Sequence, residues 1–233
     1  VEVVQGEATD DDAAHANPVG SREVVSKLVV DHPNQEGAGI FAREQWAGIS
    51  GMAVGTSINL ATSVIPLTGI FLFLIDKHLV VPTMTISGVT QALPAHPGSP
   101  ISGEGPAPTA LRGPMLPDSD RVASLVDLAW ARSGDKGHLF NVAVIARKPE
   151  YQPILDAEVT EEAVARYFAH RINGKVSRWR LPGINGFNFL LREALGGGGM
   201  ASLKADPLAK AFAQMLLDMP VRVPAEIAKR LAA

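Results

Sequence analysis

The most regular pattern of apolar and polar positions lies in the second half of the chain. Residues 125–132 and 139–146 are apolar runs of strand length, and the second run is nearly continuous, which predicts a buried strand. Thr160, followed by two acidic residues, predicts a capped helix that extends to about residue 172. Residues 175–181 predict a further strand, which a Pro-Gly pair ends.

The C-terminal residues continue this alternation. After the Pro-Gly pair, apolar residues fall on one helical face, and a glycine run predicts the end of that helix. The residues of this face are Phe187, Leu190, Leu191 and Leu195. Residues 200–204 predict a short strand, and Asp206 followed by proline predicts a helix that extends to about residue 219. Residues 221–223 could form a last strand. The order β-β-α-β-α-β-α predicts an α/β (α+β) sandwich of ferredoxin-like layout, with one mixed sheet and helices on a face.

Composition divides the chain into four parts. Residues 1–20 carry an acidic run that is typical of a disordered or extended terminus. Residues 21–92 predict a smaller, partial α/β segment. Residues 93–120 are rich in proline and glycine, lack a helix or strand period, and therefore predict a linker. Residues 121–233 contain the ferredoxin-like pattern.

Within the partial α/β segment, the pattern predicts a strand at 24–30, a helix near 35–53 and an edge strand at 79–87. The stretch 51–75 has no charged residue, so a membrane-spanning helix is one interpretation. Its proline, glycines and polar residues interrupt the apolar run that a span requires. We therefore expect buried strands there and no membrane attachment.

Charge and residue usage narrow the function classes. The net charge of −3 disfavours a nucleic-acid partner. The chain has no cysteine, which excludes disulfides and thiolate metal sites and agrees with a cytoplasmic location. Its histidines do not occur at metal-ligand spacing, so we expect no metal. The N-terminal residues are acidic where a signal peptide would be basic.

The polar residues between the first two apolar runs form the first candidate site. They predict a tight loop, which is either an anion cradle or a plain hairpin turn with a solvated lysine. In the cradle, Lys136 recognises negative charge, Asp135 orients it or transfers a proton, and His138 is a general acid or base unless it is a surface histidine. The expected ligand-binding residues of this segment are Arg132, Ser133, Gly134, Gly137 and Asn141.

The glycine run at residues 196–199 is the second candidate. Gly197 and Gly198 would allow a ligand to approach the backbone, with Ser202 nearby, although a flexible connection is the alternative. The run matches neither a Walker motif nor a dinucleotide-binding motif. The two candidate loops would form one site if they lie at the same end of the sheet.

Two further groups of polar residues have structural explanations that we favour. Arg178 and Arg180 share one face of a predicted strand and could bind an anion, but an exposed arginine face with Trp179 buried is the preferred interpretation. Asn185 and Asn188 are expected to cap the predicted helix.

Six segments are similar to the acyclic terpene utilisation (AtuA) family. They are "AWARSGDKG" (129–137), "NVAVIARKP" (141–149), "LPGINGFNFLL" (181–191), "LGGGG" (195–199), "SLKADPLAK" (202–210) and "VRVP" (221–224). In this order and spacing, residues 125–224 resemble the C-terminal domain of that family. The resemblance implies a ferredoxin-like fold, as the pattern does.

The resemblance continues upstream in a weaker form. Residues 28–57 and 63–80 resemble the tail of the family's large N-terminal domain, and the rest of that domain does not occur in this sequence. We therefore expect a homo- or hetero-oligomer, in which a separate chain could supply the large domain.

The family context implies a pathway. AtuA proteins are associated with the bacterial breakdown of acyclic terpenes such as citronellol and geraniol, which proceeds through acyl-CoA thioesters. We expect a protein of this catabolism, with hydratase or lyase chemistry on a branched acyl-CoA, a CoA thioester as ligand and no other cofactor. One alternative is a non-catalytic small subunit that completes a larger enzyme. Another is a ligand-binding module without turnover.

Overall fold

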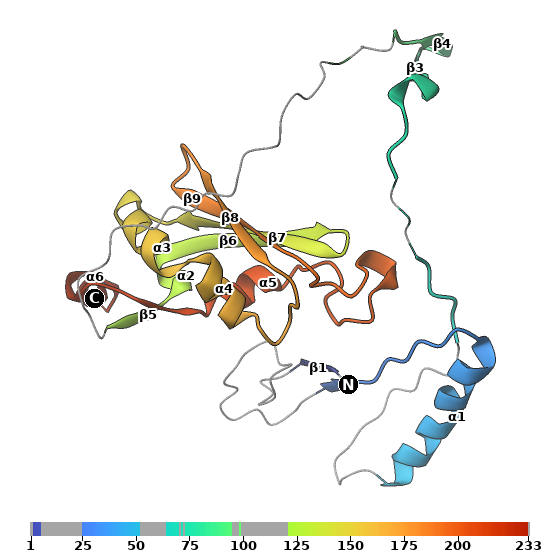
Figure 1. The fold of residues 1–233 in the computed structure, drawn as a ribbon, viewed down its shortest axis with the longest axis horizontal. Helices are drawn as coiled ribbons and strands as arrows, with labels where there is room; N and C mark the ends of the chain where they lie inside the picture. Colours follow the sequence, from blue (N-terminus) through green and yellow to red (C-terminus); the bar gives the residue numbers. More distant parts are fainter. Residues whose placement is uncertain are drawn as a thin grey trace. The chain divides into compact units, whose positions relative to one another are not determined.

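The computed structural model of the chain describes most of the second half and several segments of the first (Figure 1). The described residues are 2–5, 25–51, 64–69, 71, 73–94, 98 and 121–232. The chain divides into two compact units, of which one is Ile70–Ala107 and the other contains the remaining residues. The described part of the predicted linker is too short to test that prediction.

Two short strands and one helix precede the smaller unit in the sequence. Strand β1 (Glu2–Gln5) pairs with β2 (Val25–Lys27) in an antiparallel ladder. Helix α1 (Gln35–Gly51) agrees with the predicted helix. It begins after Asn34, whose Oδ1 accepts a hydrogen bond from the Gly37 amide at 2.8 Å, so the asparagine satisfies one of the amides that the first turn leaves unpaired.

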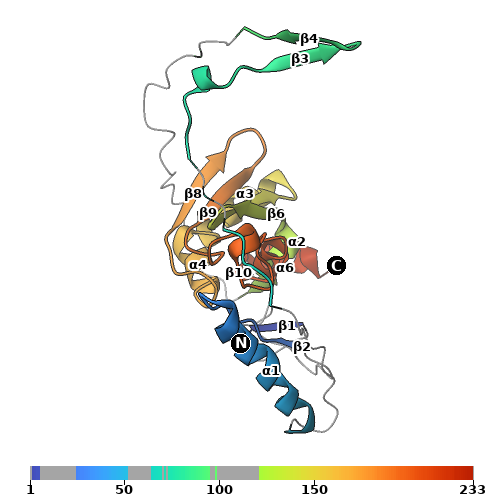
Figure 2. The same cartoon turned by 90° about the vertical axis from the view of Figure 1, so that its right-hand side faces the viewer.

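The smaller unit is an exposed hairpin with an extended approach. A short 3₁₀ turn, η1 (Lys77–Leu79), precedes β3 (Thr83–Ile86) and β4 (Val89–Ala92), which form the two-stranded hairpin visible in Figure 2. Ser87 and Gly88 connect the strands with φ of 52° and 82°, as a type I′ turn requires. The expected strand at 79–87 is thus shorter and pairs with a strand that the sequence interpretation missed.

The uncharged stretch 51–75 differs from the prediction wherever the structure describes it. Residues 64–69, 71 and 73–75 form no helix or strand, and large apolar side chains among them are exposed. Phe71 is 85% exposed and Phe73 is 70% exposed. The prediction of buried strands is therefore wrong for these residues, which form no strand and leave their large apolar side chains mostly exposed. Residues 52–63, 70 and 72 lie outside the described part of the chain.

The second half forms a four-stranded antiparallel sheet with helices packed against it (Figure 1). Its strands are β6 (Ala129–Lys136), β7 (Leu139–Ala146), β8 (Val176–Leu181) and β9 (Gly186–Leu191), in the spatial order β6-β7-β9-β8. The connections contain η2 (Pro149–Tyr151), α3 (Gln152–Glu158), α4 (Glu161–Tyr167), η3 (Gly199–Ala201) and α5 (Phe212–Leu217). The remaining elements are β5 (Val122–Ser124), which pairs with β10 (Pro220–Arg222), and the helices α2 (Leu125–Leu128) and α6 (Ala225–Leu231).

The topology is that of a ferredoxin-like sandwich read from a different starting strand. Each half of the domain is a β-hairpin, β6-β7 or β8-β9, followed by helical structure. The second strands of the two hairpins, β7 and β9, pair with each other at the centre of the sheet. A β-α-β-β-α-β unit gives the same strand order when its chain is entered at the second strand. The α+β, ferredoxin-like prediction is therefore confirmed, but the predicted mixed sheet is wrong, because all of its strand pairs are antiparallel.

The core lies between one face of the sheet and the helices. Alternate residues of β7 and β9 are buried, as the twofold period of a strand requires. The aromatic centre consists of Phe140, Phe168 and Phe212, and the Phe140 and Phe212 ring centroids are 4.3 Å apart. Burial of each such side chain contributes roughly 2–3 kcal/mol, so this cluster ties α4 and α5 to β7.

Strand β9 replaces the helix that the sequence predicted near Phe187. Phe187, Phe189 and Leu191 are buried on the core side of this strand, and Asn188 and Leu190 lie on the other side. The apolar residues satisfy a helical face and a strand face equally well. Pairing with β7 on one side and β8 on the other decides between them, because both partners supply complete hydrogen-bonding ladders.

Other boundaries also shift. Residues 200–204 contain the end of η3 and a loop, so the predicted short strand is wrong. Helix α4 ends at Tyr167 and α5 begins only at Phe212, and the sequence interpretation missed α3 and α6. The predicted cap at Thr160 is present, since its Oγ1 accepts from the Ala163 amide at 3.1 Å.

Candidate functional site

The polar segment that was predicted as a loop belongs mainly to strand β6. Ser133 to Lys136 continue the ladder with β7, and only Gly137 and His138 form the turn, in which Gly137 has a φ of 73°. The apolar and polar residues of β6 therefore share one ladder. The prediction of a cradle made by a loop of consecutive amides is wrong, because the amides of successive residues in a strand point to opposite edges and cannot converge on one anion.

The two faces of β6 carry different side chains. Ser133 and Asp135 lie opposite the buried residues of β7 and point toward the helix side. Arg132, Gly134 and Lys136 occupy the other face, where Gly134 pairs with Asn141. β6 is also an edge strand, since the sheet order begins with it. Side chains from both faces can therefore meet around its outer edge.

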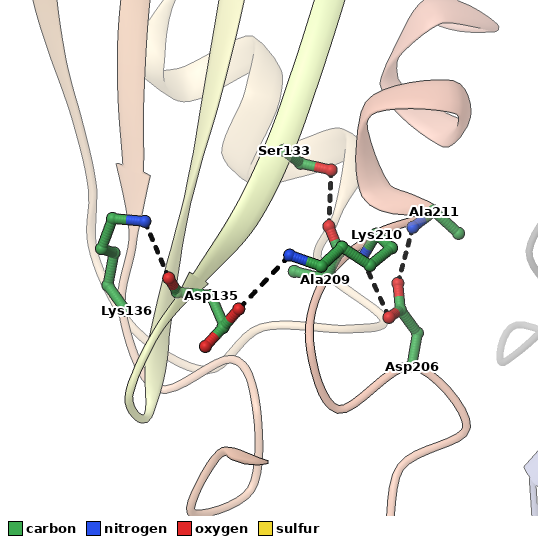
Figure 3. A network of polar contacts seen from close by, with 7 residues as sticks. All are labelled: Ser133, Asp135, Lys136, Asp206, Ala209, Lys210 and Ala211. Carbon is green, nitrogen blue, oxygen red and sulfur yellow. Dashed lines mark hydrogen bonds and ion pairs between the residues drawn. The ribbon is translucent and has the colours of Figure 1, made fainter.

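A turn that precedes α5 packs along this edge (Figure 3). Asp206 fixes the turn, because its carboxylate accepts hydrogen bonds from the Lys210 amide at 2.9 Å and the Ala211 amide at 2.8 Å. The Asp135 amide donates to the Leu208 carbonyl at 3.1 Å, which joins the turn to β6. Within the turn, Ala209 has a left-handed φ of 52°.

Ser133 makes the second connection between the edge and the turn. Its Oγ donates to the Ala209 carbonyl at 2.5 Å and accepts from the Ala213 amide at 2.9 Å (Figure 3 shows the first contact). Ala213 lies in the first turn of α5, so the serine caps this helix from a neighbouring strand. The hydroxyl of Ser133 is thus a structural link and is not available as a nucleophile.

The turn brings Lys210 to the edge of β6. The Lys210 Nζ lies 3.5 Å from Asp135 Oδ1, and the side chains are 65% and 35% exposed, so solvent weakens this ion pair. A Cβ built on Gly134 would lie 3.5 Å from the same ammonium, which shows how closely the lysine approaches the strand. The Lys136 Nζ donates to the Asp135 carbonyl at 2.8 Å (Figure 3).

A pocket of about 620 Å³ lies at this edge. The described residues that line it are Ala131, Arg132, Ser133, Gly134, Lys136, Asn141, Ala143, Lys210, Ala213 and Gln214. This lining contains three cationic side chains and no acidic one. Asn141 also lines the pocket, and it donates from Nδ2 to Asn188 Oδ1 at 2.9 Å. The pocket is therefore suited to a negatively charged molecule that also carries hydrogen-bonding groups.

The structure gathers part of the predicted site and separates the rest. Five predicted residues line the pocket, namely Arg132, Ser133, Gly134, Lys136 and Asn141. Asp135 is not among the described lining residues, but it forms an ion pair with Lys210, which does line the pocket. The sequence interpretation missed Lys210, Ala213 and Gln214, although Lys210 ends the quoted segment "SLKADPLAK" and its charge was the available signal.

The predicted glycine site packs against the β6–β7 turn. The Gly197 amide donates to His138 Nδ1 at 2.8 Å, and the His138 carbonyl accepts from the Leu195 amide at 3.1 Å. A Cβ on Gly198, which has a φ of 74°, would collide with the carbonyl of Gly137. The two candidate loops therefore do lie together, and the glycines allow the backbones to approach closely. The described pocket lining, however, does not include Gly137, His138, Gly197 or Gly198.

Ser202 also stands apart from the pocket. Its Oγ accepts from the Lys204 amide at 3.2 Å, and the lysine ammonium donates to the Arg171 carbonyl at 2.9 Å. Neither residue is among the described residues that line the pocket. The structure gives Ser202 a role in shaping its own loop.

The preferred prediction for the arginines of β8 holds for Arg180, which is exposed and pairs with Asp156 at 3.0 Å, but it is wrong for Arg178 and Trp179. Arg178 is 2% exposed on the helix side, and its guanidinium donates to the Val159 carbonyl at 2.9 Å and stacks on Phe187. Trp179 is only half-buried, on the other face. The carbonyls of Asp156 and Val159, at the end of α3, both accept from its Nη1, which offsets part of the cost of burying the charge. Burial lowers the pKa of Arg178, and nearby acids, Glu161 first, oppose this effect.

Two asparagines also differ from the prediction, because no helix forms near them. Asn188 lies in β9 and accepts the hydrogen bond from Asn141. Asn185 precedes the strand with a φ of 49°, and its carbonyl accepts from the Ala146 amide at 3.0 Å. Both side chains therefore belong to the sheet and its connecting turn.

Neither a metal centre nor a membrane span is found in the described segments. No group of three or more histidine or acidic residues in these segments could hold a metal ion. In the same part of the chain, no helix has the length and apolar character needed to cross a bilayer.

The antiparallel sheet, its strand order and its one-sided helical layer define the second half as a ferredoxin-like α+β domain. Residues 123–222 match the family model of the AtuA ferredoxin-like domain. This part of the chain is therefore an AtuA ferredoxin-like domain, which confirms the resemblance found for residues 125–224. Comparisons with curated proteins and with solved structures gave no significant match.

Proposed function

We propose that the AtuA ferredoxin-like domain binds the anionic part of an acyl-CoA thioester in the pocket at the edge of β6. One observation carries this proposal: the described lining has three cationic side chains, Arg132, Lys136 and Lys210, and no acidic one. No carboxylate among the described residues pairs with Arg132 or Lys136. Phosphate oxygens would supply the missing negative charge through charge-assisted hydrogen bonds.

We further propose that the chain acts in acyl-CoA and acyclic terpenoid catabolism, in a hydratase or lyase step on a branched acyl-CoA. Such a step requires a group that moves a proton. Asp135 is the carboxylate beside the pocket, and Lys210 holds it there. Lys136 and Lys210 would recognise charge. His138 is a weaker candidate for proton transfer, because its Nδ1 already accepts the Gly197 amide.

Calorimetric titration of the full chain with CoA and with 3-methylcrotonyl-CoA tests the binding step. We expect binding that weakens as salt increases. Lys136→Ala and Lys210→Ala should each weaken it by about tenfold, the loss expected for one charge-assisted hydrogen bond. Lys229→Ala is the matched control, because this exposed lysine lies on α6 and not in the described pocket lining. Equal affinity of all four proteins would contradict the proposal.

A separate assay tests the proposed chemistry. Product formation from 3-methylcrotonyl-CoA would be followed by mass spectrometry for the wild type and for Asp135→Asn. We expect the variant to lose turnover by roughly 100-fold or more, as for removal of a general acid or base, while its CoA affinity stays within about threefold. Binding without turnover by the wild type would favour a non-catalytic module.

A second function, that of a subunit in a larger assembly, is favoured by the exposed apolar segment. Between Leu79 and Leu93 there is no charged residue, and Ile86 and Val89 at the hairpin tip are 60% and 70% exposed. Such surfaces in folded proteins are usually covered by a partner. We propose a second chain that supplies the large AtuA domain, or a second copy, as this partner. Light scattering on the purified chain tests it, and a stable, soluble monomer would contradict it.

A further inference from the structure

We infer that the outer edge of β6 binds the amide-bearing pantetheine arm of the ligand as an additional strand-like partner. This inference rests on the proposed CoA binding and deepens it. The cationic residues account for negative charge, but they do not account for the shape of a pocket that extends along the strand as far as Ala131.

Hydrogen-bond alternation identifies the available backbone groups. In an antiparallel ladder, the amide and carbonyl of every second residue point to the same side of the strand. The Asp135 amide points outward, because it donates to the Leu208 carbonyl. The amides and carbonyls of Ser133 and Ala131 therefore also point outward, and within the described segments no backbone group pairs with either residue at this edge.

These outward-facing groups are accessible from the pocket. Ala131 and Ser133 both line it, and their neighbour Gly134 has no side chain. The Ser133 side chain is engaged by the turn before α5, so it does not compete for the strand's own amides. An unpaired strand edge is a template for any extended chain with amide groups. The two residues lie roughly 7 Å apart along the strand, at two residues of about 3.4 Å each.

The charged groups give the bound chain a direction. Lys136 and Lys210 gather at Asp135, at the end of the edge that lies nearest the β6–β7 turn. The phosphate end of the ligand belongs there, and the two amides of the pantetheine arm extend from it toward Ser133 and Ala131. Neither contact moves charge or breaks a bond, so the edge contributes binding and orientation.

Amide NMR spectra of the full chain test this arrangement with 4′-phosphopantetheine, pantetheine and adenosine 3′,5′-bisphosphate as probes. We expect the Ala131 and Ser133 amide signals to shift most with the two pantetheine compounds. The bisphosphate should shift signals near Lys136 and Lys210 but leave those two amides in place. Phosphopantetheine with both amides N-methylated should bind at least about tenfold more weakly, since it cannot donate to the strand.

Substitution at the edge provides a second measurement. Ala131→Pro removes one outward amide, and proline is tolerated on edge strands. We expect it to weaken phosphopantetheine binding by about tenfold and to leave bisphosphate binding unchanged. If that variant does not fold, the amide spectra and the N-methylated probe still decide. CoA binding without perturbation of Ala131 and Ser133 would overturn the inference alone, whereas absence of any CoA or bisphosphate binding would overturn the proposed function as well.

Discussion

Replacement of Ser133 by alanine tests whether one hydroxyl fixes the lysine-bearing turn to the sheet. The hydroxyl donates to the Ala209 carbonyl at 2.5 Å and accepts from the Ala213 amide at 2.9 Å. Both partner residues are buried, at 0% and 2% exposure, so removal of the hydroxyl leaves their backbone groups without this protein partner. The N-cap residue of α5 makes no side-chain capping bond, so Ser133 is its substitute.

The expected loss follows from these two bonds. A buried group left without a partner costs about 1–3 kcal/mol, and removal of a helix cap typically costs about 1 kcal/mol. Because the two effects share the Ala213 amide, they are not fully additive. We expect the free energy of unfolding to fall by about 2–3 kcal/mol. The loosened turn should also weaken CoA binding, since it carries Lys210.

Urea unfolding followed by tryptophan fluorescence measures the change, with Trp130 and Trp179 as reporters in the domain. Ser133→Thr retains the hydroxyl and suits a strand, so its stability should stay near that of the wild type. Ser124→Ala is the matched control, because Ser124 precedes α2 without a side-chain capping bond. A Ser133→Ala variant within about 0.5 kcal/mol of the wild type would refute the reasoning, since a single unsatisfied buried group costs more than that.

Three further predictions use calorimetric or denaturant unfolding. Ala209→Gly should leave the free energy of unfolding nearly unchanged, because relief of about 1–2 kcal/mol of left-handed backbone strain offsets the loss of the buried methyl group. Ala213→Gly, in helix α5, should lower the free energy of unfolding by about 1 kcal/mol or more. Gly198→Ala should destabilise the domain through its clash with Gly137, and wild-type stability would contradict this. Burial, followed by a nearby acid, raises the pKa of Tyr167 to about 12. The folded state therefore holds this proton more tightly than the unfolded state, so stability should fall between about pH 10 and 12, and Tyr167→Phe should flatten that fall.

The sequence predicted the fold class because its strand and turn signals are local. The apolar run at 139–146 and the cap at Thr160 each specify an element without reference to the rest of the chain. Phe187 to Leu195 could not be assigned in the same way. Their apolar spacing suits a helix or a strand, and only the flanking strands β7 and β8, which a single segment does not contain, select the strand.

The site was half predictable for a related reason. Arg132, Lys136 and Asn141 lie on adjacent strands of one hairpin, so sequence proximity already placed them near one another. Lys210 is 75 residues from Asp135 and reaches it only because a turn folds back on the edge of β6. No periodicity in either segment encodes that contact. The charge of Lys210 was visible in the sequence, but its position required the tertiary structure.

The edge position of β6 connects these findings. A central strand has its backbone groups paired on both sides, so a pocket beside it can be lined only by side chains. β6 has one open side, which the turn at Asp206 covers in part and leaves open at Ala131. The same turn supplies the third cation of the pocket. Loss of the Ser133 hydroxyl should therefore lower stability and affinity together. Loss of the Lys136 side chain should lower affinity alone, since the only described hydrogen bond of this side chain is an exposed one to the Asp135 carbonyl. That separation distinguishes a site built by the fold from a surface that merely carries charge.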